Sequence, residues 1–115
     1  MSGRTTRQLL RSILAEIDRV AGLIEECRTE NFCKDKRLIA AVTDSVRAIS
    51  SLERGIPTII RVKYALVPWT ELAGLEDTII RWDPGTRPRL LWKISTETLP
   101  RIRPIVENLL KEMEN

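Results

Sequence analysis

The sequence predicts an all-α protein, an up-and-down bundle of four or five helices that forms one domain over residues 1–115. A chain of 115 residues can bury one core, but each half would be too short for a core of its own. The apolar residues, 43% of the chain, are mostly aliphatic, and there are only five glycines, whereas a β-sandwich or barrel needs more aromatic residues and turn glycines. Apolar residues instead recur every three or four positions, the period of an amphipathic helix.

The first predicted helix spans residues 4–28, and either Thr5 or Thr6 can cap its start. Its apolar stripe consists of Leu10, Ile13, Leu14, Ile17, Val20, Ala21, Ile24 and Cys27. Residues 29–34 lose this period and are predicted to form a loop held in place by Phe32.

A second helix is predicted from Asp35 to Gly55, just before Pro57. Its stripe consists of Leu38, Ile39, Val42, Val46, Ile49 and Leu52. Residues 58–67 favour a strand by composition, but a lone strand has no partner in a chain of helices. We therefore expect an irregular or short helical connector there.

The third predicted helix begins at Pro68 and stops at the turn formed by residues 83–85. Its shared face consists of Trp69, Leu72, Ala73, Glu76, Ile79 and Ile80. A short helix then opens at Pro88, and Thr96 or Thr98 is expected to cap a last helix that carries Pro100 in its first turn.

Several classes of function are excluded by what the chain lacks. There is no histidine, so the chain alone has no Ser-His-Asp or Cys-His catalytic site and no imidazole metal site. Neither glycine-rich phosphate-binding motif, that of Rossmann proteins or that of P-loop proteins, occurs. Cys27 and Cys33 fit neither a zinc site nor a redox pair, so we expect free thiols. We expect no cofactor and no metal.

The apolar runs and the net charge bear on cellular location and on nucleic-acid binding. No apolar run approaches the roughly 20 residues of a membrane span, and no signal peptide is visible, so we expect a cytoplasmic protein without membrane contact. The net charge of +3 is too small to argue for nucleic acid by itself.

Residues 68–83 contain an unusual density of specific residues. The run has Pro68-Trp69, then Ala73-Gly74, then Glu76-Asp77, with Arg81 and Asp83 at its end. This resembles the signature helix of the HepT-like HEPN family, in which Pro-Trp and a small Ala-Gly step precede Arg-polar-x-x-x-His-x-Tyr. Two further segments are similar to the family, covering residues 8–112 in all. They are Asp35-Lys36-Arg37 leading into Ala41-Val42, and Leu91-Trp92-Lys93-Ile94 through Leu99-Pro100 to Leu109-Leu110.

The resemblance implies a single HepT-like HEPN domain, a homodimeric toxin that cleaves RNA and is neutralised by a minimal nucleotidyltransferase antitoxin. In the family, the histidine helps activate the ribose 2′-hydroxyl, the arginine holds the phosphate, and the tyrosine receives a nucleotide from the partner. The corresponding positions here are Glu76 for the arginine, Asp77 for its polar neighbour, Arg81 for the histidine and Asp83 for the tyrosine.

These replacements argue against catalysis. A guanidinium at position 81 stays protonated and cannot act as a general base near neutral pH. Glu76 and Asp77 would repel a phosphate. We therefore expect a catalytically degenerate RNase fold that acts through dimerisation and partner binding. Two alternatives remain: an active, metal-independent endoribonuclease in which Glu76 is the base and Arg81 binds the phosphate, or a helical scaffold or RNA-binding adaptor.

Candidate interface residues lie on and after the same helix. Asp77 and Arg81 have the spacing of a surface ion pair. Glu76 lies on an apolar face, so it could instead pair with Arg81 of the partner subunit in a homodimer. The predicted dimer interface is Trp69, Glu76, Ile80 and Arg81.

A basic cluster is the other candidate, with Trp82 and Trp92 available to stack on bases. It consists of Arg81, Arg87, Arg89, Lys93, Arg101 and Arg103. From it we single out Arg81, Trp82, Arg87, Arg89 and Lys93 as RNA- or partner-binding residues. The alternative is a solvated surface, with Trp92 in the core and Trp82 exposed.

Overall fold

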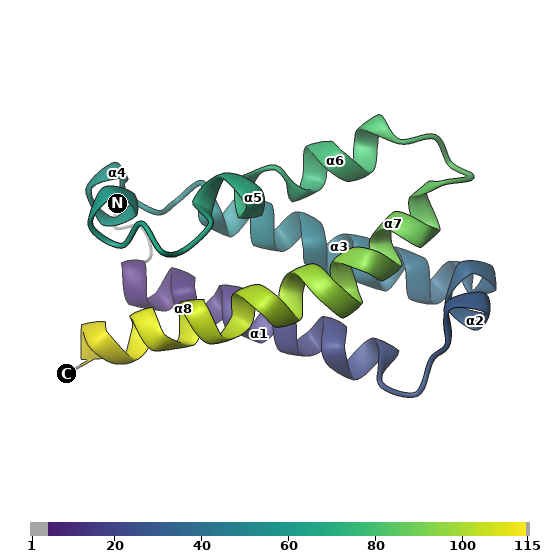
Figure 1. Cartoon of the computed structure of the whole chain (residues 1–115), viewed down its shortest axis with the longest axis horizontal. Coiled ribbons are helices and arrows are strands. Elements are labelled where there is room, and N and C mark those ends of the chain that lie inside the picture. Colours follow the sequence, from purple (N-terminus) through teal and green to yellow (C-terminus); the bar gives the residue numbers. More distant parts are fainter. Residues whose placement is uncertain (1–4, 115) are drawn as a thin grey trace.

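The computed structural model describes residues 5–114. The chain folds into an elongated helical bundle that measures 43 × 27 × 27 Å (Figure 1). The helices are α1 (Thr6–Ile24), α2 (Thr29–Lys34), α3 (Lys36–Glu53), α4 (Thr58–Lys63), α5 (Trp69–Ala73), α6 (Leu75–Arg81), α7 (Arg87–Lys93), the π-helical turn η1 (Ile94–Thr98) and α8 (Leu99–Glu114). The predicted all-α bundle is confirmed, and residues 5–114 contain no strand.

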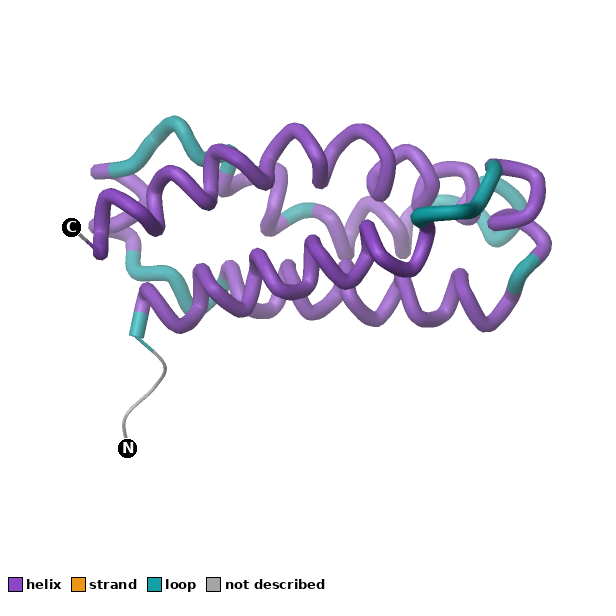
Figure 2. Tube along the Cα trace, turned by 90° about the horizontal axis from the view of Figure 1, so that it is seen from below, coloured by secondary structure: helices purple, strands orange, loops and turns teal. Residues whose placement is uncertain are grey.

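The core lies between the long helices. α1 packs along α3 and α8, while α5 and α6 cover α3 (Figures 1 and 2). Inward-facing residues follow the predicted spacing of three and four. Those completely buried include Leu10, Ile13, Val20, Val42, Val46, Ile49, Ile102 and Val106.

Local hydrogen bonds set the starts of α1 and α3. The Thr5 hydroxyl accepts the Gln8 N–H at 3.1 Å, and the Thr5 N–H donates to the Gln8 side chain at 2.8 Å. Asp35 accepts the Leu38 N–H at 3.1 Å. Both predicted starts are confirmed. α1 ends at Ile24 rather than at residue 28, and Ala21 is exposed, so its buried stripe is narrower than predicted.

The segments predicted as a loop and as an irregular or short helical connector both contain short helices. Residues 29–34 form α2 instead of a loop, but Phe32 is completely buried, as expected, and its ring centroid lies 5.4 Å from that of Trp92. The connector after Pro57 contains α4, the helical alternative of the prediction. Both helices have six residues, too few for the period to show in the sequence.

The third predicted helix is broken into α5 and α6. In an unbroken helix the Glu76 N–H would donate to the Leu72 carbonyl four residues back. Here it donates to the Ser50 hydroxyl of α3 at 3.1 Å, and that hydroxyl donates to the Leu72 carbonyl at 3.0 Å. The inserted hydroxyl therefore separates the two helices next to Gly74.

The predicted break before the last helix is absent. α7, η1 and α8 run on without interruption, and Thr96 donates its hydroxyl to the Trp92 carbonyl at 2.8 Å instead of capping a helix. The Leu99 N–H donates to the Ile94 carbonyl five residues back. This widened turn relieves the crowding of the preceding helix by the Pro100 ring, so a proline that marks a helix start in the sequence lies inside one.

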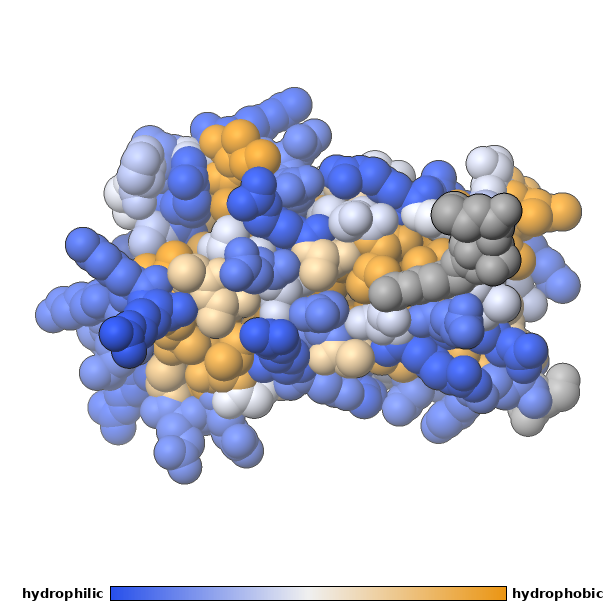
Figure 3. All heavy atoms as spheres, turned by 180° about the vertical axis from the view of Figure 1, so that it is seen from behind, coloured by the Kyte–Doolittle hydropathy of each residue, from blue (hydrophilic) through white to orange (hydrophobic). Residues whose placement is uncertain are grey.

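The surface is mixed. The face seen from behind in Figure 3 is largely hydrophilic, with apolar side chains between the charged ones. The large apolar residues most exposed in the described part are Ile59, Val62, Leu66, Ile80 and Trp82. Ile80 was predicted on the buried face of the third helix, but its exposed fraction is 58%. The buried residues of α6 are Leu75 and Ile79 instead.

Candidate functional site

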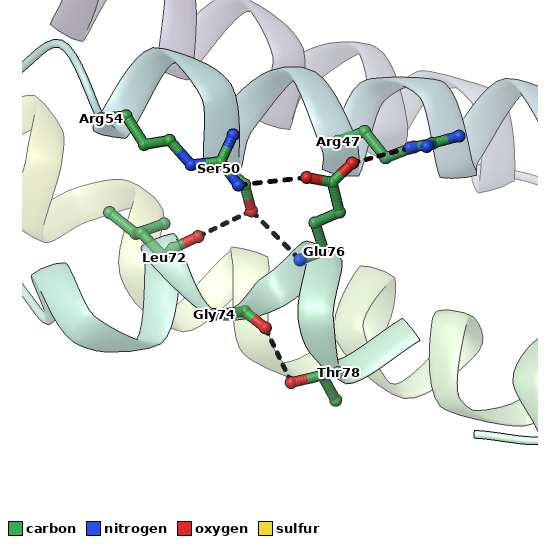
Figure 4. Close-up of polar contacts among 7 residues, drawn as sticks. All are labelled: Arg47, Ser50, Arg54, Leu72, Gly74, Glu76 and Thr78. Carbon is green, nitrogen blue, oxygen red and sulfur yellow. Dashed lines mark hydrogen bonds and ion pairs between the residues drawn. The ribbon is translucent and has the colours of Figure 1, made fainter. Parts of the chain in front are cut away.

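Glu76 is held by two arginines of α3. Its carboxylate accepts a hydrogen bond from Arg47 Nε at 2.8 Å and another from Arg54 Nη2 at 3.1 Å (Figure 4). The Glu76 side chain is 20% exposed, while both arginine side chains are more than half exposed. The hydrogen bond from Arg47, together with that from Arg54, lowers the pKa of the Glu76 carboxyl.

Ser50 holds the backbone of Glu76 next to these two arginines. It lies between Arg47 and Arg54 on α3, is completely buried, and bonds the Glu76 backbone rather than its side chain (Figure 4). Residues 47, 50 and 54 share one helix face because their spacing is three and four. The same face of α3 thus supplies both the hydroxyl that breaks the neighbouring helix and the cations that bind the carboxylate.

We expect Ser50→Ala to destabilise the protein by about 1–3 kcal/mol, because the Glu76 N–H and the Leu72 carbonyl would lose the hydroxyl that they share. Urea denaturation followed by circular dichroism measures the change. Ser51→Ala is the matched control, since Ser51 is the next residue of α3 and is exposed. Equal stabilities of the two variants would contradict the bridging role of Ser50.

The charge around Glu76 differs from the sequence expectation. The two acids of α6 were expected to repel a phosphate, but two arginines of α3 lie beside Glu76. Two guanidinium groups bind the single carboxylate of Glu76, so the immediate cluster carries a net positive charge. Asp77 is exposed and has no ion pair in the part of the chain that the structure describes.

Asp83 closes the turn between α6 and α7. One carboxylate oxygen accepts the N–H groups of Gly85 at 2.9 Å and Thr86 at 3.0 Å, and the other accepts the Thr86 hydroxyl at 3.0 Å. Donation by the Thr86 hydroxyl and N–H holds the pKa of Asp83 below its usual value. Both carboxylate oxygens of Asp83 therefore accept hydrogen bonds within this turn.

The comparisons with known proteins cover nearly the whole chain. "Putative RNase MJ1380" of Methanocaldococcus jannaschii is 32% identical over 107 residues, which is 93% of this chain and 98% of that protein. "Probable ribonuclease HepT" of Thermococcus cleftensis is 28% identical over 108 residues, 94% of this chain and 98% of that protein. The chain belongs to the HepT-like HEPN family. No family model matches it, and neither does any solved structure.

In this HepT-like chain the two main motif positions face different directions. Glu76 and Arg81 are five residues apart on α6. In an α-helix this separates them by about 7.5 Å along the axis and about 140° around it. The family's arginine and histidine occupy these same two positions, so this chain shares the separation with its family and differs from it in the side chains.

The residues predicted for a dimer interface are only partly available at the surface. Trp69 is buried, and its indole N–H donates to the Tyr64 carbonyl at 3.1 Å, so it belongs to the core. The Glu76 carboxylate is already bound within the chain. Ile80 and Arg81 are exposed and continue into Trp82, whose exposed fraction is 48%.

The basic cluster is partly neutralised by ion pairs. Arg101 pairs with Glu71 at 2.6 Å, and Arg103 pairs with Asp18 at 2.6 Å and with Glu107 at 3.2 Å. In the described part of the chain, Arg81, Arg89 and Lys93 form no ion pair and are exposed. Trp92 packs on Phe32, as expected of a core residue, and Trp82 is the exposed tryptophan.

The remaining candidates of the HepT-like chain form no site. Cys27 and Cys33 are half-buried free thiols. Between residues 5 and 114, no three histidine, cysteine or acidic side chains gather closely enough to hold a metal ion. Over the same residues, no helix combines the length and the apolar character needed to cross a bilayer.

Sequence reasoning singled out Glu76 but missed Arg47, Ser50 and Arg54. The signal that could have found them is their spacing on one face of the second predicted helix. A serine in line with Val46 and Ile49 is a polar residue in an apolar stripe, and such a residue requires a buried partner.

Proposed function

We propose that this HepT-like chain is a catalytically degenerate RNase of a toxin–antitoxin system. It acts as a homodimer that binds a minimal nucleotidyltransferase antitoxin rather than as a working nuclease. The observation that carries the proposal is the pairing of Glu76 with Arg47 and Arg54 at the position where the family has its phosphate-binding arginine.

The chemistry of the two motif positions supports this proposal. Attack by a ribose 2′-hydroxyl needs a base that can take up its proton near neutral pH. Arg81 remains protonated there. Glu76 is a weak base, because its arginine partners lower the pKa of its carboxyl. The alternative in which Glu76 serves as the base and Arg81 binds the phosphate is disfavoured by this low basicity of Glu76.

Binding rather than turnover is supported by the exposed end of α6. Ile80, Arg81 and Trp82 present an apolar, a cationic and an aromatic side chain in succession at the surface. Aromatic residues and arginine are the residue types enriched at protein interfaces. In a two-fold dimer each copy would contribute the same segment.

The purified chain is expected to leave RNA intact, because neither Arg81 nor Glu76 is an effective base for the 2′-hydroxyl proton near neutral pH. The measurement is gel analysis of labelled total RNA after prolonged incubation, with an unrelated protein purified in the same way as the control. Cleavage above that control, lost in Arg81→Ala or Glu76→Gln, would overturn the proposal and favour the active endoribonuclease.

A further inference from the structure

A small pocket adjoins the Glu76 cluster. It lies between α3, α6 and the start of α7 and has a volume of about 200 Å³. Its apolar wall is formed by Ile39, Ile79 and Ile80, and Arg47, Glu76 and Arg87 bring charge into it. Pockets for whole small molecules measure roughly 300–1,000 Å³. This pocket therefore suits a single group of a larger ligand.

Arg47 and Arg87 line this pocket and have unused hydrogen-bonding capacity, as does Arg54, which does not line the pocket but binds the same Glu76 carboxylate. A guanidinium has five N–H donors. In residues 5–114, Arg47 donates to Glu76 only through Nε, and Arg54 only through Nη2. Arg87 donates through Nη2 to the Trp82 carbonyl at 3.0 Å, while its Nε is out of contact with solvent and has no partner there. A buried N–H without a partner is unfavourable, and Arg87 is one of the residues that line the pocket.

The Glu76 carboxylate has the properties of a substitute ligand for these cations. Planar oxyanions, carboxylate and phosphate alike, are bound by arginine forks in the same way. We propose that Glu76 masks a phosphate site. With its carboxylate displaced or neutralised, Arg47 and Arg54 of α3, together with Arg87 of α7, bind one phosphodiester group of single-stranded RNA.

Two features favour RNA over an acidic protein segment. Trp82 is exposed, and its backbone carbonyl accepts a hydrogen bond from Arg87, so an aromatic residue available for stacking on a base is bonded to a residue that lines the pocket. Arg81, Arg89 and Lys93 add exposed cations without ion pairs on α6 and α7, which suits a ligand with a repeating negative charge. The inference rests on the proposed function only for the substrate class, and it concerns binding rather than cleavage.

Glu76→Gln removes the charge and keeps the shape of the side chain. The bond from the residue 76 N–H to Ser50 involves the backbone and remains available in this variant. We expect binding of a fluorescent single-stranded RNA oligonucleotide to become about 10-fold tighter at low salt. The slope of the logarithm of affinity against the logarithm of salt should steepen by about 0.7, the value for one additional phosphate contact on a single strand.

Matched variants distinguish RNA binding at this site from a general gain in affinity caused by the loss of a negative charge. Asp44→Asn removes one negative charge from α3 close to Arg47, and Asp44 forms no ion pair in the described residues. We expect its RNA affinity to stay within about twofold of the wild type. Adding Arg47→Gln and Arg54→Gln to Glu76→Gln is expected to abolish the gain. Equal gains in Glu76→Gln and Asp44→Asn would overturn the proposal, as would a gain that survives loss of the arginines.

A measurement on the unaltered chain covers the case in which the substitutions impair folding. With RNA in excess, the NMR signals of the Nε–H groups of Arg47 and Arg87 should shift. That of Arg11, paired with Glu114 between the start of α1 and the end of α8, should not shift. Stationary Arg47 and Arg87 signals would count against the site. A poly-glutamate peptide that shifts them more than RNA at equal charge would replace the phosphate assignment with an acidic protein segment. RNA cleavage by the wild type would refute the proposed function but leave this test unaffected.

Discussion

Arg61→Ala is expected to lower the free energy of unfolding by about 2–3 kcal/mol at pH 8, and by much less near pH 4. Arg61 of α4 contacts the Glu53 carboxylate, Nε to Oε2, at 3.1 Å and donates through Nη2 to the Glu53 carbonyl at 3.0 Å. The Glu53 side chain is only 3% exposed. Removing Arg61 leaves a buried carboxylate and a carbonyl at the end of α3 without this partner.

The pH dependence follows from the state of Glu53. Burial raises the pKa of its carboxyl above the ordinary value, although Arg61 and Arg54 act in the opposite direction. Because the folded-state pKa lies above the unfolded-state pKa, Glu53 lowers stability as the pH rises from the unfolded value through the folded one. Without Arg61 the folded-state pKa rises further, so the variant loses more stability over that range.

Urea denaturation of the wild type and Arg61→Ala between pH 4 and pH 8 measures this difference. Glu53→Gln in the Arg61→Ala background supplies the control, because a neutral amide at position 53 does not titrate. The double variant should show a smaller deficit that does not depend on pH. A deficit of the same size at every pH in Arg61→Ala would mean that Arg61 contributes only packing and its bond to the carbonyl.

The long helices were predictable because their signals are local. α1 and α3 each combine an apolar stripe with a cap three residues from the N–H that it accepts. Neither the break after Gly74 nor the continuity through Pro100 could be predicted in this way. The first depends on Ser50, 26 residues from Glu76 in the sequence. The second depends on a π-helical turn that moves one carbonyl acceptor along the chain.

The same distinction applies to the candidate site. Glu76 attracts attention in the sequence because a carboxylate on an apolar helix face requires a cation. The sequence does not identify this cation, and Arg81 of the partner subunit is one candidate. Arg47 and Arg54, 29 and 22 residues away, supply it because α3 packs against α6. A contact between helices, rather than any local pattern, decides the partner.

The double substitution Glu76→Arg with Arg81→His is expected to produce RNA cleavage at least about 100-fold above the wild-type background. It returns to these positions the two residue types that the family motif has. An imidazole has an unperturbed pKa of about 6.5 and can accept the proton of a ribose hydroxyl, and general base catalysis contributes about 10²–10⁴-fold. The measurement is the rate of cleavage of a labelled RNA at pH 7.

A matched variant with Glu76→Arg and Arg81→Gln carries the new cation without a base, so it should bind RNA but not cleave it. The added guanidinium at position 76 lies close to Arg47 and Arg54, whose mutual repulsion is then no longer offset by a carboxylate. Thermal denaturation must therefore show that both variants are folded at the assay temperature. Equal cleavage by the two would point to a contaminating nuclease. A folded double variant that binds RNA but does not cut it would mean that the degeneracy extends beyond positions 76 and 81. The next position to restore would then be Asp83, whose carboxylate accepts hydrogen bonds in the turn after α6.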